Sequence, residues 1–324
     1  MTRSHIVRCG LLGILIFFFV GYLPGLGSRP LIRPDEFRYA EIPREMRLSG
    51  DWTTPRFCGV RYFEKPALGY QFNAASFSLF GENAFALRWP SALAVLLTAL
   101  FGWYFLNRTT RDPWLGTLAA GLYLGFGLVF GVGTFAVFDS QLTAALTICS
   151  GSFFLAWQER RRSRKFAFLA LAGVAAGAGF LLKGGLALVI PSIIAVPFLL
   201  WQKEYRQIFS YPWIPLVFAL ATALPWSLAI ASAEPDFWRY FIIEEHWNRF
   251  TGSTYDRGPE PFWYFLPVLL GGVLPTGLLA LTVRLNKPAG LPREPLLRFL
   301  LCAAVIPFVF FSASSCKLGT YILP

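Results

Sequence analysis

The sequence predicts an all-α integral membrane protein with about nine transmembrane helices. Of its 324 residues, 55% are hydrophobic and only 15% are charged, whereas soluble domains carry about 25% charged residues. Apolar runs recur along the chain at about 20 residues, the length that an α-helix needs to cross the hydrocarbon core of a bilayer. Basic residues fall on every second connection between these runs, which is typical of short cytoplasmic loops.

The apolar runs give the expected order of the transmembrane helices. The first covers residues 9–26 and follows Arg3 and Arg8, and small residues at 25–28 offer the alternative of a cleaved signal peptide. Because this run is long for a signal peptide and more spans follow, we expect a retained first helix. The further spans are expected at residues 89–106, 114–133, 139–157, 166–182, 186–201, 212–232, 262–283 and 296–313.

Charge on the short connections predicts the orientation. Lys and Arg cluster near the N-terminus and on alternate connections, whereas residues 131–138 contain neither. An odd number of spans with the N-terminus in the cytoplasm fits this alternation. The net charge of +11 therefore reflects orientation in the membrane, and we expect no nucleic acid as a partner.

Residues 1–324 are expected to form one transmembrane domain with two longer loops on its non-cytoplasmic side. Residues 28–87 form the first loop and residues 233–260 the second. The first loop is basic although it lies outside, because loops of that length obey the charge rule weakly.

Two short helices are expected in the first loop. Charged residues repeat at steps of three or four over residues 38–48, and Gly50 follows as a stop signal. Residues 66–80 begin with proline and are rich in aromatic and small residues. Both segments are expected to lie at the membrane interface.

This topology brings ionisable residues from separate segments to the non-cytoplasmic face. Such groups cost free energy beside a bilayer, so a collection of them predicts a site. Their gathering at one face favours an enzyme over a transporter, whose charges commonly lie near mid-membrane. The collected residues are Asp35, Glu36, Glu64, Lys65, Asp139, Lys183, His246, Arg249, Lys317 and Tyr321.

The acidic and basic candidates each have a structural alternative. Asp35 and Asp139 stand where helices are expected to begin, so either could be a helix cap. Glu64 and Lys65 could neutralise each other at the surface, or the lysine could hold a phosphate at headgroup level. For Lys183 we favour extension of the side chain to the interface.

A metal site is the further alternative in this group. His246 is one of only two histidines in the chain, and together with Glu64 it could bind a divalent metal. Two ligands far apart in sequence do not define a metal site, and a hydrogen-bonded histidine explains the residue as well. Arg249, three residues later, offers bidentate phosphate binding.

Other motifs are missing from the sequence. Five cysteines show no redox or metal spacing, and free thiols explain them better than a disulfide between Cys58 and Cys316, which fall on one side of the membrane. No P-loop, G-x-G-x-x-G or nucleophile elbow occurs. A nucleotide-driven pump or a soluble-type hydrolase therefore finds no support.

Six sequence blocks carry a resemblance to a known family. The blocks are PDEFRYAEI at 34–42, GDW at 50–52, YFEKP at 62–66, EHWNRFTG at 245–252, PFWYFLP at 261–267 and KLGTYILP at 317–324. With these blocks in this order, the chain resembles the lipid A aminoarabinose transferases, bacterial relatives of the protein O-mannosyltransferases.

The resemblance implies a C-type glycosyltransferase fold in the bacterial inner membrane, with its active site facing the periplasm. Such an enzyme moves a sugar, here 4-amino-4-deoxy-L-arabinose, from undecaprenyl phosphate to lipid A. Alternatives are another sugar with a glycolipid or protein acceptor, a lipid-linked sugar transporter, or a lipid-binding remnant. Relatives continue with more spans and a soluble periplasmic domain, so we expect the chain to be truncated at the C-terminus, with that domain absent.

The same resemblance implies roles for individual residues. It places catalytic acids at Asp35 and Asp139, and we expect Glu36, next to Asp35, to take part in catalysis. It places the donor phosphate against Lys65, with helpers at Arg249 and Tyr321, and we expect Lys317 to bind the same phosphate. It places a divalent metal such as Zn²⁺ near Glu64 and His246. The leaving phosphate gains negative charge in the reaction, so stabilisation of that charge by cations is expected to be the largest contribution to catalysis.

Overall fold

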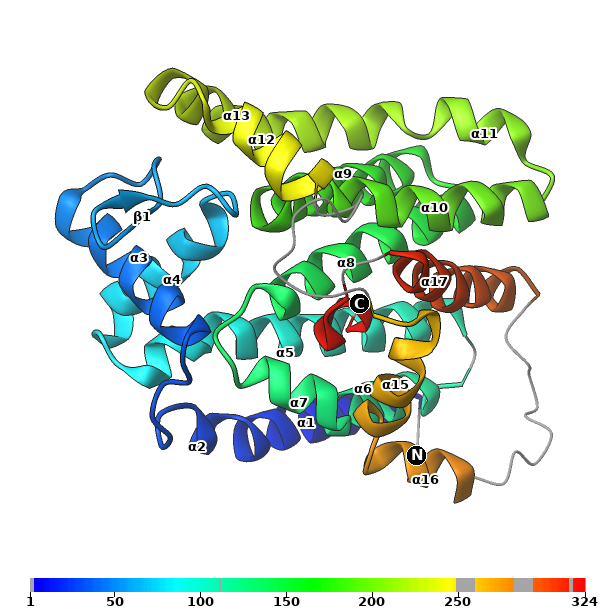
Figure 1. The fold of residues 1–324 in the computed structure, drawn as a ribbon. Helices are drawn as coiled ribbons and strands as arrows, with labels where there is room; N and C mark the ends of the chain where they lie inside the picture. Colours follow the sequence, from blue (N-terminus) through cyan, green and yellow to red (C-terminus); the bar gives the residue numbers. More distant parts are fainter. Residues whose placement is uncertain (1–2, 111, 249–259, 283–293, 315–316, 324) are drawn as a thin grey trace.

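The computed structural model is a bundle of membrane-length helices with a small polar subdomain at one end (Figure 1). It describes residues 3–110, 112–248, 260–282, 294–314 and 317–323. Within these residues every expected span is mostly helical, which confirms the all-α membrane fold. The helices of the bundle are α1 (Arg3–Gly21), α2 (Leu23–Leu26), α5 (Ala84–Thr109), α6 (Leu115–Gly125), α7 (Gly127–Gly133), α8 (Asp139–Gln158), α9 (Arg162–Lys183), α10 (Leu186–Trp201), α11 (Tyr205–Ser210), α12 (Trp213–Ala233), α15 (Phe265–Gly272), α16 (Thr276–Thr282) and α17 (Glu294–Ala313).

Five helical stretches of the described chain are long and apolar enough to cross a membrane. They are Arg3–Leu26, Ala84–Thr109, Arg162–Lys183, Tyr205–Ala233 and Glu294–Ala313. Leu115–Gly125, Leu186–Trp201 and Phe262–Gly272 are shorter apolar helices. The remaining long helix, α8, has many polar residues in its first half, and they lower its mean hydropathy. These residues are buried, which shows that α8 lies at the centre of the bundle.

Two of the expected spans, 114–133 and 262–283, are broken, and the breaks meet. Phe126 separates α6 from α7 and pairs with Pro275, which separates α15 from α16. The amide of Gly127 donates to the carbonyl of Leu274 at 2.6 Å, and the Thr276 hydroxyl donates to a carbonyl of α6 at 3.0 Å. Backbone groups freed by a helix break must find partners in an apolar interior, and here each broken helix supplies them to the other.

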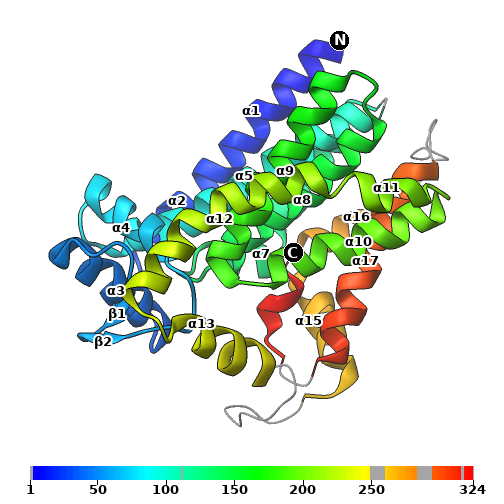
Figure 2. The same cartoon turned by 90° about the horizontal axis from the view of Figure 1, so that it is seen from above.

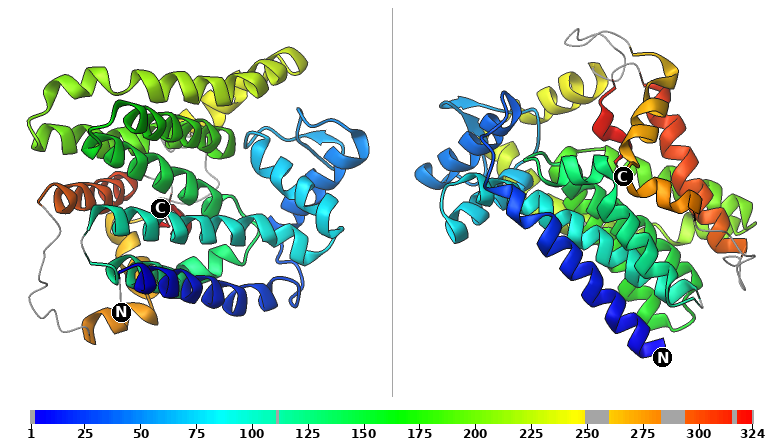
Figure 3. Two further views of the ribbon diagram at one scale, coloured as in Figure 1. Left: turned by 180° about the vertical axis from the view of Figure 1, so that it is seen from behind. Right: turned by 90° about the horizontal axis from the view of Figure 1, so that it is seen from below.

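Small residues let the central helices approach closely. A Cβ on Gly173 of α9 would lie 2.3 Å from the carbonyl oxygen of Pro215 in α12, and one on Gly177 would lie 2.6 Å from that of Ala219. Close approach at small residues is the usual way in which membrane helices gain van der Waals contact. The α8, α9 and α12 helices therefore form a tight layer beside α5 (Figure 3).

The first loop folds into the polar subdomain. It contains α3 (Asp35–Ser49), a hairpin of β1 (Arg56–Phe57) and β2 (Val60–Arg61), and α4 (Leu68–Phe80). Both expected loop helices are thus confirmed, and Gly50 ends α3 in the left-handed conformation at φ +72°. The hairpin was not expected from the sequence. Figure 2 shows all of these elements at the end of the bundle away from the N-terminus.

The second loop begins beside the hairpin. Short helical segments α13 (Phe237–Arg239) and η1 (Tyr240–Asn248) follow α12, and η2 (Phe262–Tyr264) and η3 (Gly319–Ile322) lie near the chain's end. Glu234, after α12, accepts hydrogen bonds from Arg56 at 3.2 Å and from Arg61 at 2.8 Å. These contacts place both loops on one side of the bundle.

The opposite end of the bundle collects the basic connections. Arg3 donates to the carbonyl of Asn107 at 3.0 Å, and Arg108 pairs with Glu159 at 2.6 Å. Residues that the charge pattern assigned to one side therefore contact each other. The four cysteines that the structure describes are free, and Cys316 lies outside the described residues.

Candidate active site

One guanidinium, that of Arg38, joins the first turn of α3 to the segment that follows the hairpin. Its Nη2 donates to Asp35 at 2.6 Å, and its Nη1 donates to the Tyr62 hydroxyl at 3.1 Å and lies 3.7 Å from a Glu64 oxygen. The Asp35 side chain keeps 42% of its surface exposed. Two of the motif blocks thus meet around Arg38, with the Asp35 carboxylate still open to a ligand.

Lys65 lies in an aromatic enclosure next to this cluster. Its ammonium donates to the hydroxyl of Tyr39, lies 4.8 Å from the centre of that ring and lies 5.8 Å from the centre of the Phe138 ring. Burial lowers the pKa of Lys65 below the ordinary 10.5, and the charges of Asp139 and Glu64 partly oppose this. The charged form is therefore costly without an anion, which makes the site receptive to one.

Packing fixes the aromatic wall of this enclosure. The rings of Tyr39 and Phe138 meet edge to face at 4.7 Å, and Tyr70 of α4 meets Phe138 at 4.8 Å. Gly69 lies against the same ring, since a Cβ there would come within 2.5 Å of it. The absence of a side chain at Gly69 thus allows Phe138 to reach the enclosure.

A second ion pair joins the start of α8 to the end of α9. Lys183 donates to Asp139 at 2.7 Å, and its ammonium lies 5.5 Å from the centre of the Tyr321 ring in η3. Both charged side chains are mostly buried, at 14% and 11% exposure. The expected extension of Lys183 to the interface was wrong. An acid that opens one span and a base that closes the next lie on the same side, a signal that the sequence already contained.

Lys317 is engaged with backbone rather than with the acids. Its ammonium donates to the carbonyls of Glu260 at 2.8 Å and Ser314 at 2.6 Å, and the residue is 5% exposed. It thereby ties the start of η2 to the end of α17. This contact holds the segment that carries Tyr321 next to Lys183.

Glu36 has a different setting from its neighbour Asp35. It is fully buried, and Arg88 of α5 donates to its two oxygens at 2.7 Å each. The amides of Ile32 and Ala136 donate to the same carboxylate at 2.9 and 3.1 Å. Burial alone would raise the pKa of Glu36, but these hydrogen bonds outweigh it and lower the pKa. These donors occupy both oxygens of Glu36 in the structure, and its expected catalytic role stays a prediction.

The structure describes only some of the residues predicted to bind the metal and the donor phosphate. Arg249 and the side chain of His246 lie outside the described residues. Among those that are described, no group of three His, Cys, Asp or Glu side chains could hold a metal ion. Glu64 has Arg38 as its charged neighbour. The described residues thus form no metal centre by themselves, and the metal stays a prediction.

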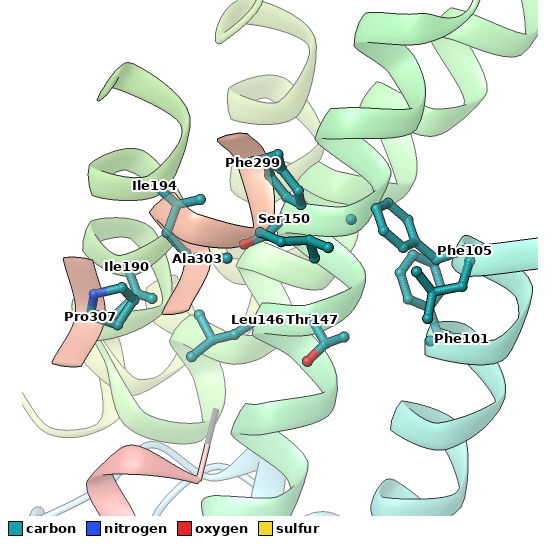
Figure 4. Close-up of a pocket in the computed structure, with 14 residues that line it drawn as sticks. Phe101, Phe105, Leu146, Thr147, Ser150, Ile190, Ile194, Phe299, Ala303 and Pro307 are labelled. Carbon is teal, nitrogen blue, oxygen red and sulfur yellow. The ribbon is translucent and has the colours of Figure 1, made fainter. Parts of the chain in front are cut away.

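An apolar pocket lies inside the bundle, further along α8 than Asp139. Leu146, Thr147 and Ser150 of α8 line it, and they share a helix face with Asp139 because they follow it by seven, eight and eleven residues. The pocket has a volume of 250 Å³ and is completed by α5, α10 and α17. Figure 4 shows Ser150 near its centre, with Phe105 and Phe299 around it. Its lining is almost entirely hydrocarbon, which suits an apolar ligand.

Together, the fold and the site define a multi-spanning α-helical membrane protein of the C-type glycosyltransferase architecture, with its ionisable groups at one end of the bundle. The chain belongs to the dolichyl-phosphate-mannose-protein mannosyltransferase family, whose family model matches residues 7–241. Its similarity to aminoarabinose transferases, expected from the six blocks, is confirmed by relatives and by solved structures.

Two relatives illustrate the similarity in sequence. An undecaprenyl phosphate-alpha-4-amino-4-deoxy-L-arabinose arabinosyl transferase 2 of Proteus mirabilis is 41% identical over 100% of this chain and 58% of its own length. The corresponding transferase of Yersinia pestis is 43% identical over 96% of this chain and 56% of its own. The chain thus spans somewhat more than half the length of the curated relatives that it matches.

Solved structures show the same likeness. ArnT from Cupriavidus metallidurans, bound to undecaprenyl phosphate, superimposes with a TM-score of 0.82 at 27% identity, over 99% of this chain and 58% of that one. The Pmt1–Pmt2 protein O-mannosyltransferase complex of S. cerevisiae reaches a TM-score of 0.52 at 14% identity, over 81% of this chain and 36% of that one. At that identity the yeast complex supports the fold alone.

Proposed function

We propose that this chain forms the membrane domain of a glycosyltransferase that moves 4-amino-4-deoxy-L-arabinose from undecaprenyl phosphate to lipid A. The reaction would take place at the periplasmic face of a bacterial inner membrane, onto which residues 28–87 and 233–260 would project. The observation that carries this proposal is the Lys65 ammonium enclosed by Tyr39 and Phe138, with acids nearby. The names of the relatives supply the sugar and the lipid carrier.

Lys65 would stabilise the leaving group. The bond between the sugar's anomeric carbon and the phosphate oxygen breaks, and the lipid phosphate leaves with more negative charge. An ammonium in a partly dehydrated site interacts with that charge more strongly than one in water. We assign Lys65 to this phosphate, with Arg249 and Tyr321 as further ligands. Lys317, with its ammonium on two carbonyls, would position η3.

Asp35 and Asp139 would act on the sugar and the acceptor. A new bond forms between the anomeric carbon and an acceptor oxygen, and Asp35 is exposed enough to orient that oxygen or to take its proton. An ionised phosphate acceptor would need orientation more than a base. Asp139 is held by Lys183 at 2.7 Å, which suits a carboxylate that must keep a fixed position. Glu36 would position the start of α3 through Arg88.

The apolar pocket would take part of the donor's isoprenoid chain. It lies on the face of α8 that begins with Asp139, and all but a few of its lining side chains are hydrocarbon. A chain seated there would place its phosphate toward the ionisable end of the bundle. Burial of isoprenoid carbon supplies affinity without recognition of any particular group.

A transporter of lipid-linked sugar is the alternative from another class. Broken spans, such as α6/α7 and α15/α16, are a common feature of transporters. Here, however, the breaks at Phe126 and Pro275 are paired with each other, and neither broken span carries a charged residue. The enzyme is therefore the better proposal.

The proposal is tested in a bacterial host that lacks its own aminoarabinose transferase. The full-length protein is expressed there, and lipid A is read by mass spectrometry. We expect the sugar's mass on lipid A with the parent and with Lys203→Gln, an exposed control on the basic side. We expect none with Lys65→Ala. Unmodified lipid A with the parent would reject the proposed substrate, and modified lipid A with Lys65→Ala would reject the proposed role of Lys65.

Chelation of the purified enzyme tests the Zn²⁺ that Glu64 and His246 would bind.

A further inference from the structure

A groove beside Asp35 carries a guanidinium that pairs with no acid in the part of the chain that the structure describes. Arg33, Pro34, Phe37, Arg38 and Phe57 line it, at the start of α3 and on the first strand of the hairpin. The groove is open and has a volume of 520 Å³. Neither the donor phosphate nor the acceptor chemistry described above uses it.

The two arginines of the groove differ in their partners. Arg38 is engaged by Asp35, Tyr62 and Glu64. Arg33 makes no hydrogen bond or ion pair with any residue that the structure describes, and its guanidinium lies 5.0 Å from the centre of the Phe37 ring. A stacked guanidinium keeps its edge donors available for a planar or tetrahedral oxyanion. The groove is therefore cationic, and Arg33 supplies its charge.

Apolar side chains of Pro34, Phe37 and Phe57 line the same groove. Phe37 keeps 41% of its surface exposed and Ile32, next to Arg33 in sequence, keeps 46%, although both are large and hydrophobic. They lie in the loop that packs on the outer end of the bundle, where lipid headgroups and the first part of their acyl chains are found. A cation with apolar neighbours matches an amphiphile with an anionic headgroup better than a free anion.

We propose that Arg33 binds a phosphate on the acceptor lipid and holds the acceptor's headgroup beside Asp35. The groove adjoins that carboxylate because Arg38 lines the groove and also donates to Asp35 at 2.6 Å. Lys65 is enclosed by aromatic rings, whereas Arg33 is exposed. The two substrates would thus use separate cations, with Lys65 for the donor and Arg33 for the acceptor. This inference deepens the proposed function and rests on it.

The kinetic test separates the two substrates. With the full-length protein in detergent micelles, initial rates of sugar transfer are measured against acceptor and donor concentrations. For Arg33→Gln we expect KM for the acceptor to rise about tenfold, with kcat and KM for the donor within about twofold of the parent. Arg33→Lys keeps the charge without the planar fork, so a rise of about threefold is expected. Arg44→Gln, which removes a guanidinium paired with Glu41 on the same helix, is the matched control and should leave all constants unchanged.

A binding test needs no transfer. Affinities are compared for lipid A with its phosphates, for the same lipid after enzymatic dephosphorylation, and for inorganic phosphate, with no donor present. Arg33→Gln should weaken only the first of these about tenfold. Equal affinity of parent and variant for phosphorylated lipid A would overturn the inference, as would inorganic phosphate that competes at the lipid's own concentration.

The two tests also distinguish the two proposals. Binding that depends on Arg33 and on the lipid's phosphate, without any sugar transfer by the parent, would reject the enzyme but support the groove. Normal transfer and an unchanged acceptor KM in Arg33→Gln would reject the groove alone. Equal melting temperatures of parent, Arg33→Gln and Arg33→Lys verify that the variants are folded.

Discussion

Asp35 and Glu36 are adjacent acids on the first turn of α3, yet they lie in opposite environments. Asp35 is 42% exposed and pairs with an arginine on its own helix, whereas Glu36 is fully buried and pairs with Arg88 of another helix. An α-helix turns by about 100° per residue, so neighbouring side chains point to different surroundings. The same dipeptide can therefore supply one group for chemistry and one for the fold.

The buried member of this pair holds the first loop to the bundle. Besides binding Glu36, Arg88 donates to the carbonyls of Leu26, Arg29 and Pro30 at 2.7, 3.1 and 2.9 Å. These bonds join the end of the first span to α5 and to the start of α3. The exposed position of Asp35 depends on this anchor, which lies one residue away in sequence but inside the protein.

The largest expected effect comes from breaking the buried pair. Arg88→Met leaves the Glu36 carboxylate without its cation, and removal of one partner of a buried pair costs about 3–5 kcal/mol. We expect a large fall in folded yield and in melting temperature, measured by thermal unfolding in detergent. The double variant Arg88→Met with Glu36→Leu should recover part of the loss. A melting temperature unchanged by Arg88→Met would remove the proposed structural role.

Asp35→Asn should reduce the activity and leave the stability nearly unchanged, in contrast to Arg88→Met. The ion pair of Asp35 with Arg38 is only half-buried, at 42% and 29% side-chain exposure, so solvent screens it and the stability should change by less than about 1 kcal/mol. Loss of a carboxylate that orients or deprotonates the acceptor should reduce kcat about 100-fold. Thermal unfolding and initial rates on the same preparation measure both. If Asp35→Asn unfolds the protein while transfer per folded molecule is retained, the contrast with Glu36 fails.

Lys183→Met should give an intermediate effect. It leaves the Asp139 carboxylate, 11% exposed, without the cation that holds it at 2.7 Å. We expect kcat, measured from initial rates, to fall about tenfold to thirtyfold, because a carboxylate that is no longer held leaves the productive geometry. Lys183→Arg should restore most of the rate. A kcat equal to that of the parent would show that Lys183 only fills space.

Much of this architecture could be predicted from the sequence because it depends on local signals. Run length and hydropathy located the spans, charge alternation located the basic connections, and charge spacing with Gly50 located α3. The hairpin was missed because its turn residues, Cys58 and Gly59 at φ +52° and +77°, include a cysteine where asparagine or aspartate usually stands.

The rest of the site depends on contacts between remote segments. Glu36 and Arg88 lie 52 residues apart, and nothing in either segment identifies the other as its partner. The breaks at Phe126 and Pro275 exist because each is closed by the other. By contrast, the pairing of Asp139 with Lys183 could have been inferred from the topology, which puts both residues on one side. It was not predicted because extension of the side chain to the interface is a sufficient explanation for a single lysine.

The smallest expected effect is a pH dependence of donor binding that originates at Lys65. Burial lowers its pKa below 10.5, so the ammonium that binds phosphate is lost at a lower pH than for an exposed lysine. Affinity for undecaprenyl phosphate should therefore be full well below this lowered pKa and fall as pH rises through it. In the free protein the same lowered pKa destabilises the folded state as pH falls, because the unfolded chain holds the proton more tightly.

Titration of undecaprenyl phosphate binding between about pH 7 and 10 measures the loss of affinity. Lys65→Arg keeps its charge over this range and should give a flat profile. A flat profile for the parent would mean that the phosphate is held elsewhere, and the division between a donor cation and an acceptor cation would have to be redrawn.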